Sequence, residues 1–175
     1  MRAPPHGLRS GWITPMESSS MPMDELLSEV SRLHFPNPPA SPAQIDAFEQ
    51  RVGWRLDPDL RAFYLYCDGA NLFDRVDPAF SFLPLAMIRR ARVVMLQDDT
   101  DASGPASWYA ACEVQDSNYI LLDVGHQEGG RYLIRDGYRE GFPDPEYCPQ
   151  IAGSFSEFLR GALRSNGRWF WLRKD

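Results

Sequence analysis

Residues 41–73, SPAQIDAFEQRVGWRLDPDLRAFYLYCDGANLF, decide the fold of this chain because they contain two helices with their start and stop signals. Ser41 can cap the first helix, Pro42 suits the first helical position, and Gln44 completes a capping box. Gly53 can end this helix in a left-handed conformation. The stretch therefore predicts a helix that begins after Ser41 and ends before Gly53.

The second helix of this stretch starts with the same kind of signal, Asp57 followed by Pro58. Its apolar residues recur at positions i, i+3, i+4 and i+7, which places them on one helical face. These residues are Leu60, Phe63, Tyr64 and Cys67. Gly69 is expected to close the helix.

This helix pair resembles the SUKH superfamily, which groups bacterial toxin-immunity proteins with fungal cell-wall-synthesis regulators. The resemblance lies in a Gly-aromatic-x-Leu-x-Pro connector, here Gly53, Trp54, Leu56 and Pro58, and in an Asp-Gly stop before a β segment. It continues in FLPL (82–85), YILLDV (119–124) and IAGSFSEFL (151–159), and covers residues 23–163. Many relatives have a glycine-rich turn before the central strand, whereas this chain has Gln, Asp, Ser and Asn at 115–118.

Length and composition fit one ordinary domain, since the chain has 175 residues of which 43% are hydrophobic. We expect a disordered N-terminal extension at 1–20, a SUKH-like domain at 21–167, and an aromatic and basic tail at 168–175. The fold class is predicted to be α+β, with an antiparallel sheet and helices packed mainly on one of its faces.

The other elements follow from hydrophobic periodicity and from turn residues. They are a helix at 23–33, a linker at 35–39, a strand at 80–82, a helix at 85–96, an acidic loop at 97–107, strands at 108–114, 119–124 and 131–135, and a last helix that begins with a Ser154 and Glu157 capping box and ends at Gly167. Short polar turns between the three later strands favour an antiparallel meander.

Charge and cysteine content narrow the possible partners. The formal net charge is −6, which disfavours direct binding to nucleic acid or to anionic membranes and favours a basic partner. Residues 1–20 contain no continuous apolar run, so we expect neither a signal peptide nor a membrane helix. Cys67, Cys112 and Cys148 lack the paired spacing of zinc or redox motifs, so we expect reduced thiols, a cytoplasmic location and no cofactor.

The acidic loop imitates a calcium site. Asp99, Asp101, Ser103 and Gly104 have the spacing that begins an EF-hand loop, but position twelve is Ala110 where a bidentate glutamate is needed. We therefore expect no metal site. The loop is instead expected to be a solvated, negative contact patch for a basic partner.

Two further groups have a functional and a plain structural interpretation. A nucleophile with its base and orienting acid could be formed by Cys112, His126 and Asp123. Cys112 alternates with Ala110 and Val114, however, and this pattern favours a small buried core residue rather than a catalytic group.

A basic cluster is formed by Arg89, Arg90 and Arg92. It is best explained as a solvated helix face.

The resemblance implies a non-enzymatic protein that binds and blocks a cognate toxin, for example a basic nuclease-type domain. From charge and aromatic character we predict six partner contacts: Asp98, Asp99, Asp101, Trp108, Tyr109 and Trp169. Trp169 belongs to an aromatic ending that could either pack on the domain or form an interface. The alternatives are a regulatory scaffold of the cell-wall-synthesis branch and, more remotely, a small hydrolase.

Overall fold

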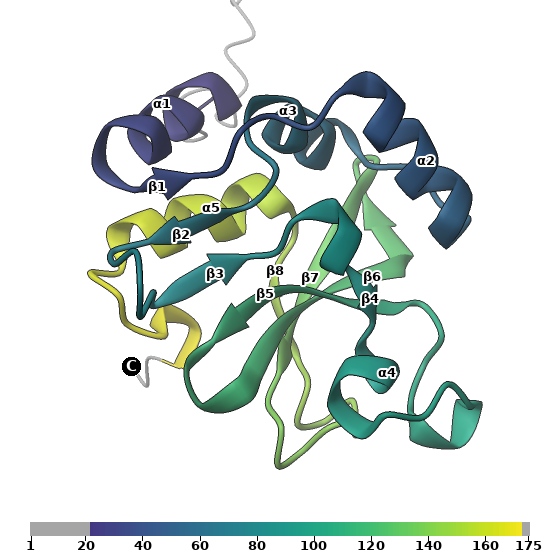
Figure 1. Cartoon of the computed structure of the whole chain (residues 1–175). Coiled ribbons are helices and arrows are strands. Elements are labelled where there is room, and N and C mark those ends of the chain that lie inside the picture. The colour runs from purple at the N-terminus through teal and green to yellow at the C-terminus, as the bar shows by residue number, and fades with distance from the viewer. Residues whose placement is uncertain (1–21, 173–175) are drawn as a thin grey trace, which may run out of the picture.

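A computed structural model describes residues 22–172 of the chain, and within that range it contains five α-helices and one eight-stranded sheet (Figure 1). The helices are α1 (Met23–Leu33), α2 (Pro42–Val52), α3 (Pro58–Tyr66), α4 (Ala91–Leu96) and α5 (Phe155–Arg164). The strands are β1 (Phe35–Pro36), β2 (Ala70–Leu72), β3 (Phe80–Phe82), β4 (Arg89–Arg90), β5 (Trp108–Val114), β6 (Asn118–Glu128), β7 (Arg131–Gly137) and β8 (Gln150–Ala152). The predicted N-terminal extension lies outside the described residues.

The predicted helix pair is confirmed, together with its caps. The amide of Gln44 donates to Ser41 Oγ at 3.1 Å and the amide of Ser41 donates to Gln44 Oε1 at 2.8 Å, which completes the capping box. Gly53 follows α2 with φ +80°, in the left-handed region that favours glycine. Asp57 caps α3, which ends at Tyr66, three residues before the expected Gly69. Helix α1 has the predicted bounds.

The sheet is antiparallel throughout, with strand order β1-β2-β3-β5-β6-β7-β8. Strand β4 also pairs with β5, so β3 and β4 follow one another along the same edge of β5. Strands β5, β6 and β7 form the predicted meander, and β6 extends four residues further than predicted. The α+β fold class with an antiparallel sheet is thus confirmed.

The predicted helix at 85–96 is wrong in its first half. The chain instead forms a short 3-10 turn, η1 (Leu85–Met87), then strand β4, and only then α4. Pairing of Arg89 with Ala110 and of Arg90 with Tyr109 holds this segment extended, so tertiary pairing overrides the helical pattern of the sequence. The expected linker at 35–39 likewise contains β1, and the last helix ends at Arg164 rather than at Gly167.

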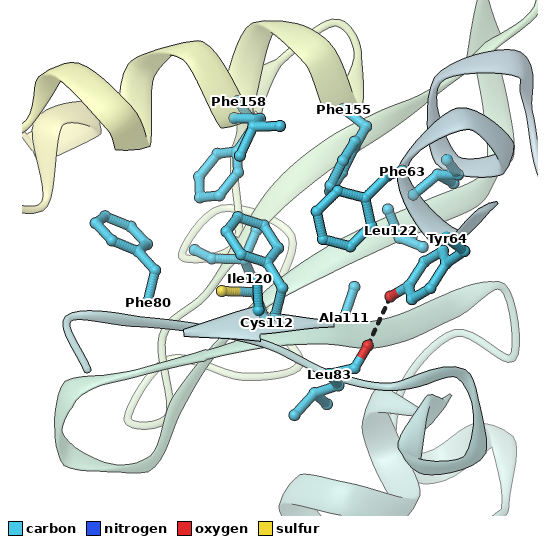
Figure 2. Close-up of a cluster of buried hydrophobic side chains, with 14 of the residues drawn as sticks. Phe63, Tyr64, Phe80, Leu83, Ala111, Cys112, Ile120, Leu122, Phe155 and Phe158 are labelled. Carbon is cyan, nitrogen blue, oxygen red and sulfur yellow. Dashed lines mark hydrogen bonds between the residues drawn. The ribbon is translucent and has the colours of Figure 1, made fainter. Parts of the chain in front are cut away.

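The main core lies between the helices and one face of the sheet (Figure 2). Phe63 of α3 and Phe155 of α5 meet edge to face with ring centroids 5.0 Å apart, and Phe158 packs on Phe80 and on Phe82 from β3. Each fully buried phenylalanine contributes about 1.5–3 kcal/mol through burial. These contacts hold α3 and α5 against one face of the sheet.

A β-bulge in β5 divides its buried residues between two clusters. The register shifts between Ala110 and Cys112, so Ala111, Cys112 and Val114 all join the main core while Ala110 faces the other side. The simple alternation of Ala110 with Cys112 is therefore wrong, although Cys112 is buried as predicted, with 1% of its surface exposed.

The second cluster covers the opposite face of the sheet. It joins residues of α4, β5 and β6 with two residues of the loop at 138–149. Its buried members are Ala91, Met95, Trp108, Ala110, Leu121, Phe142 and Cys148. In the described part of the chain, no helix is long and apolar enough to cross a bilayer.

Candidate partner-binding surface

The acidic residues of the loop predicted at 97–107 lie in the segment 98–104, which we call the acidic loop. Two arginines that precede this segment hold it in place. Arg92 Nε donates to Asp99 Oδ1 at 2.9 Å, and Arg92 Nη1 donates to Asp101 Oδ1 at 2.7 Å. Arg90 Nη1 lies 3.1 Å from Asp99 Oδ2. The Arg92 side chain is only 6% exposed, so the prediction that it lies on a solvated helix face is wrong. Burial of this guanidinium is tolerated because both carboxylates pair with it.

Asp98 organises the same loop from within. Its Oδ2 accepts hydrogen bonds of 2.6 Å from the hydroxyls of Ser103 and Thr100, and these bonds lower the pKa of the Asp98 carboxyl. The hydrogen bond from Arg92 lowers the pKa of Asp99. The carboxylates of Asp98 and Asp99 therefore stay charged, with hydroxyl and arginine donors as their partners. Among residues 22–172, no group of His, Cys, Asp and Glu side chains is arranged to hold a metal ion.

The most exposed carboxylates of this loop are Asp99 and Asp101, whose side chains are 51% and 96% exposed. Each keeps an exposed carboxylate surface while it pairs with Arg92. Because two guanidinium groups balance much of the loop's charge, the loop alone forms a weaker negative patch than the sequence indicates. The contact role of Asp98, Asp99 and Asp101 stays a prediction.

A second acidic loop, at 138–149, packs against the first. Gly104 has φ +122° and lies so close that a Cβ there would be 2.9 Å from Pro143 Cβ and 3.2 Å from Phe142 Cζ. We call the exposed side of the loops at 98–104 and 138–149 the two-loop surface. The second loop adds three carboxylates, one guanidinium and two exposed tyrosines, namely Glu140, Asp144, Glu146, Arg139, Tyr138 and Tyr147.

The sequence contains a signal for this second loop. The run GFPDPEYCP at 141–149 combines turn-forming prolines with acidic and aromatic residues, which indicates a loop with charged and aromatic side chains. The sequence does not show that this loop contacts the loop at 98–104, because the contact depends on both loops covering the same face of the sheet.

Trp108 and Tyr109 do not lie on the two-loop surface, and their role as partner contacts stays a prediction. They are 3% and 4% exposed. Trp108 packs beside Phe142 and under the Arg135 guanidinium, whose carbon is 5.1 Å from the ring centroid. Tyr109 packs against Trp54 in the main core. Both side chains pack within the fold, and Tyr109 also lines a recess that contains Arg51 and Asp99.

Trp169 lies in a different part of the molecule. The last described turn, η4 (Phe170–Leu172), packs beside α5 and β3, on the other side of the molecule from α4 (Figure 1). Trp169 is half-buried and stacks on Trp171, whose indole Nε1 donates to Asp136 Oδ2 at 3.0 Å. The residues at 169–171 of the predicted tail thus pack on the domain, and Trp169 is not brought together with the acidic loop.

Cys112, His126 and Asp123 are not assembled as a catalytic triad. The Cys112 sulfur lies among apolar side chains of the main core (Figure 2), and burial raises the pKa of this thiol well above its ordinary value. Asp123 is fully buried and accepts hydrogen bonds from Arg135 Nε at 2.7 Å and from the amide of Gly125 at 3.1 Å. Its Oδ2 lies 2.9 Å from His126 Nδ1. Asp123 therefore anchors β6 and β7, away from the thiol.

Comparison with known proteins gives two findings. The family model described as the SMI1 / KNR4 family (SUKH-1) matches residues 39–161, which run from just before α2 into α5. The immunity protein YokJ of Bacillus subtilis (strain 168) is similar to this chain, with 25% identity over 122 residues that cover 69% of this chain and 73% of the relative.

Proposed function

This chain belongs to the SMI1/KNR4 family (SUKH-1), and we propose that it is a cytoplasmic immunity-type protein that binds a cognate toxin and blocks it without chemical turnover. The name of the Bacillus subtilis relative supports this proposal, since that protein is called an immunity protein. The expected partner is a protein with a basic face, because this chain carries a net charge of −6.

The proposal rests mainly on the two-loop surface. Its carboxylates can steer a basic partner toward the surface, while exposed tyrosines can supply binding energy once the partner is docked. Tyr147 is 59% exposed and Tyr138 is 37% exposed, so both offer aromatic area that the fold itself does not use. The second core cluster lies beneath these loops and keeps them in position.

The chemistry of the buried thiols supports a binding role rather than catalysis. Cys67, Cys112 and Cys148 are free and buried, and burial raises the pKa of all three thiols, which disfavours the nucleophilic thiolate. Blocking would then arise because the bound chain covers the partner's working surface.

The test is co-expression with the protein encoded beside it, using growth rescue and co-purification as readouts. We expect the wild-type chain to relieve toxicity and to co-purify with that protein. Glu140→Lys with Glu146→Lys should weaken both effects because they reverse charge on the two-loop surface. The matched control, Asp24→Lys with Glu25→Lys on exposed positions of α1, makes the same change in net charge on the helix-covered side.

Four outcomes decide the proposal. Rescue that fails for the two-loop variant and persists for the α1 variant supports it. Equal rescue by both variants would remove the two-loop surface from the proposal, and absence of rescue and binding would count against the immunity role. Stable capture of cell-wall-synthesis components without any effect on toxicity would favour the regulatory-scaffold alternative.

A further inference from the structure

A recess of about 200 Å³ beside the acidic loop carries more positive than negative groups. It is lined by Arg51 at the end of α2, by Arg89 and Arg90 of β4, and by a single carboxylate, Asp99. Because Asp99 also belongs to the acidic loop, the recess adjoins the two-loop surface.

Arg51 is fixed in a position that leaves part of its guanidinium available. Its Nη2 donates to the carbonyl oxygens of Leu85 at 2.8 Å and of Ile88 at 2.9 Å, and its guanidinium carbon lies 5.3 Å from the centroid of the Phe48 ring. Among residues 22–172, Arg51 Nε and Nη1 have no hydrogen-bond partner. A donor group held in advance loses little conformational entropy when it binds an anion.

The charges around the recess are unbalanced. Asp99 is shared between Arg90 and Arg92, and it forms no ion pair with Arg51 or Arg89. The exposed Arg89 side chain has no hydrogen bond or ion pair within the described part of the chain. Two guanidinium groups therefore face the recess without a carboxylate, in a chain whose overall charge is negative.

We propose that this recess binds a carboxylate side chain of the partner protein, so that the partner presents an acidic residue to Arg51 and Arg89 beside the basic face that meets the two-loop surface. This proposal rests on the proposed function and specifies how the partner is recognised. Placing a positive site next to negative loops fixes the orientation of the bound partner, because a rotated partner would bring like charges together.

Size and charge favour a carboxylate over a phosphate ligand. A recess of about 200 Å³ is smaller than the roughly 300–1,000 Å³ of typical small-molecule pockets, so it fits a side chain better than a nucleotide. Asp99 in the lining repels a phosphate dianion more strongly than it repels a carboxylate monoanion. The planar guanidinium also matches the two oxygens of a carboxylate.

The experiment is a titration of the full chain with the dipeptide acetyl-Glu-Glu-amide, followed by NMR of the arginine Nε–Hε signals. The Arg51 and Arg89 signals should shift and saturate, and Arg89→Gln should weaken the apparent affinity about fivefold, as removal of one partly exposed ion pair implies. Arg32→Gln, an exposed change of equal charge on α1, should leave the affinity unchanged. Thermal unfolding of both variants checks that they remain folded.

Several results would overturn the assignment. They are an absence of saturation, an equal affinity for the wild type and Arg89→Gln, or inorganic phosphate binding more tightly than the dipeptide at equal ionic strength. Because the titration uses a free dipeptide, these results would remove the recess from the recognition scheme and leave the outcome of the co-expression test unaffected.

Discussion

Replacement of Phe142 by alanine should loosen the two-loop surface from the sheet. Phe142 is 8% exposed and packs beside Trp108 in the second cluster, with ring centroids 6.2 Å apart. It also borders Gly104 of the acidic loop. One side chain thus connects both loops to the sheet.

The expected cost follows from this position. A phenylalanine-to-alanine change in a core typically destabilises by about 3–5 kcal/mol through lost burial and the cavity left behind. The second cluster has seven buried residues and two loop segments that can relax, so we expect the lower end, about 3 kcal/mol. For a domain of this size that loss lowers the melting temperature by about 6–12 °C.

The assay combines urea denaturation with hydrogen exchange. Phe142→Leu is the matched control, since it keeps most of the apolar volume and should cost only about 1 kcal/mol. In Phe142→Ala, amide exchange should accelerate first in the segments 98–104 and 138–149, while the main-core helices stay protected. A loss below about 1 kcal/mol, or loops that exchange as in the wild type, would refute the view that Phe142 holds the surface together.

Three further predictions concern the fold and its titratable groups. Asp57→Ala should lower the free energy of unfolding, measured in urea, by about 2–3 kcal/mol, because Asp57 accepts buried hydrogen bonds from the amides of Leu60 and Tyr132. Asp57→Asn should cost less, and equal losses for the two variants would argue against this role. Burial raises the pKa of Asp136, and this effect outweighs the opposing effect of the hydrogen bond from Trp171. The stability of the wild type relative to Asp136→Asn should therefore fall as the pH rises from about 4. A difference in stability that stays flat or rises with pH would contradict this prediction. Burial raises the pKa of Cys67 to about 12 and that of Cys148 to about 11, and the third cysteine, Cys112, is buried as well. All three thiols should therefore resist iodoacetamide in the folded chain and react with it in concentrated guanidinium. Rapid labelling of the folded chain would favour the hydrolase alternative.

The helices with side-chain caps could be predicted from sequence because capping is local. Ser41 and Asp57 each accept a hydrogen bond from an amide only three residues further along the chain. All the residues that start each helix therefore lie within one short stretch of sequence. Ser154 starts α5 in the same way. In each case the starting position follows from neighbouring residues alone.

The segment at 85–90 could not be predicted because its conformation depends on a distant strand. Its apolar residues fit a helical stripe, yet β4 forms because β5 offers free backbone groups beside β3. The same is true of β1, which pairs with β2 across more than thirty residues. Local periodicity contains no information on such pairing.

The sequence indicates only part of the candidate surface. The charges of the acidic loop can be read from it, but the burial of Arg92 beneath that loop cannot, because Arg92 stands in a basic run that is typical of an exposed helix face. The burial of Trp108 and Tyr109 does not follow from the sequence, since aromatic residues fit a core and an interface equally well from composition. Only the three-dimensional contact at Gly104 joins the second loop to the surface.

We propose that this chain blocks its partner by covering it with the two-loop surface. The most direct measurement is a titration of the activity of the toxin identified by co-expression with increasing amounts of the purified chain. We predict a linear fall to complete inhibition at a fixed molar ratio, with Glu140→Lys and Glu146→Lys together requiring a large excess. Complete inhibition by a small fraction of an equivalent would point to turnover, and unchanged inhibition by that variant would show that the two-loop surface does not block the toxin.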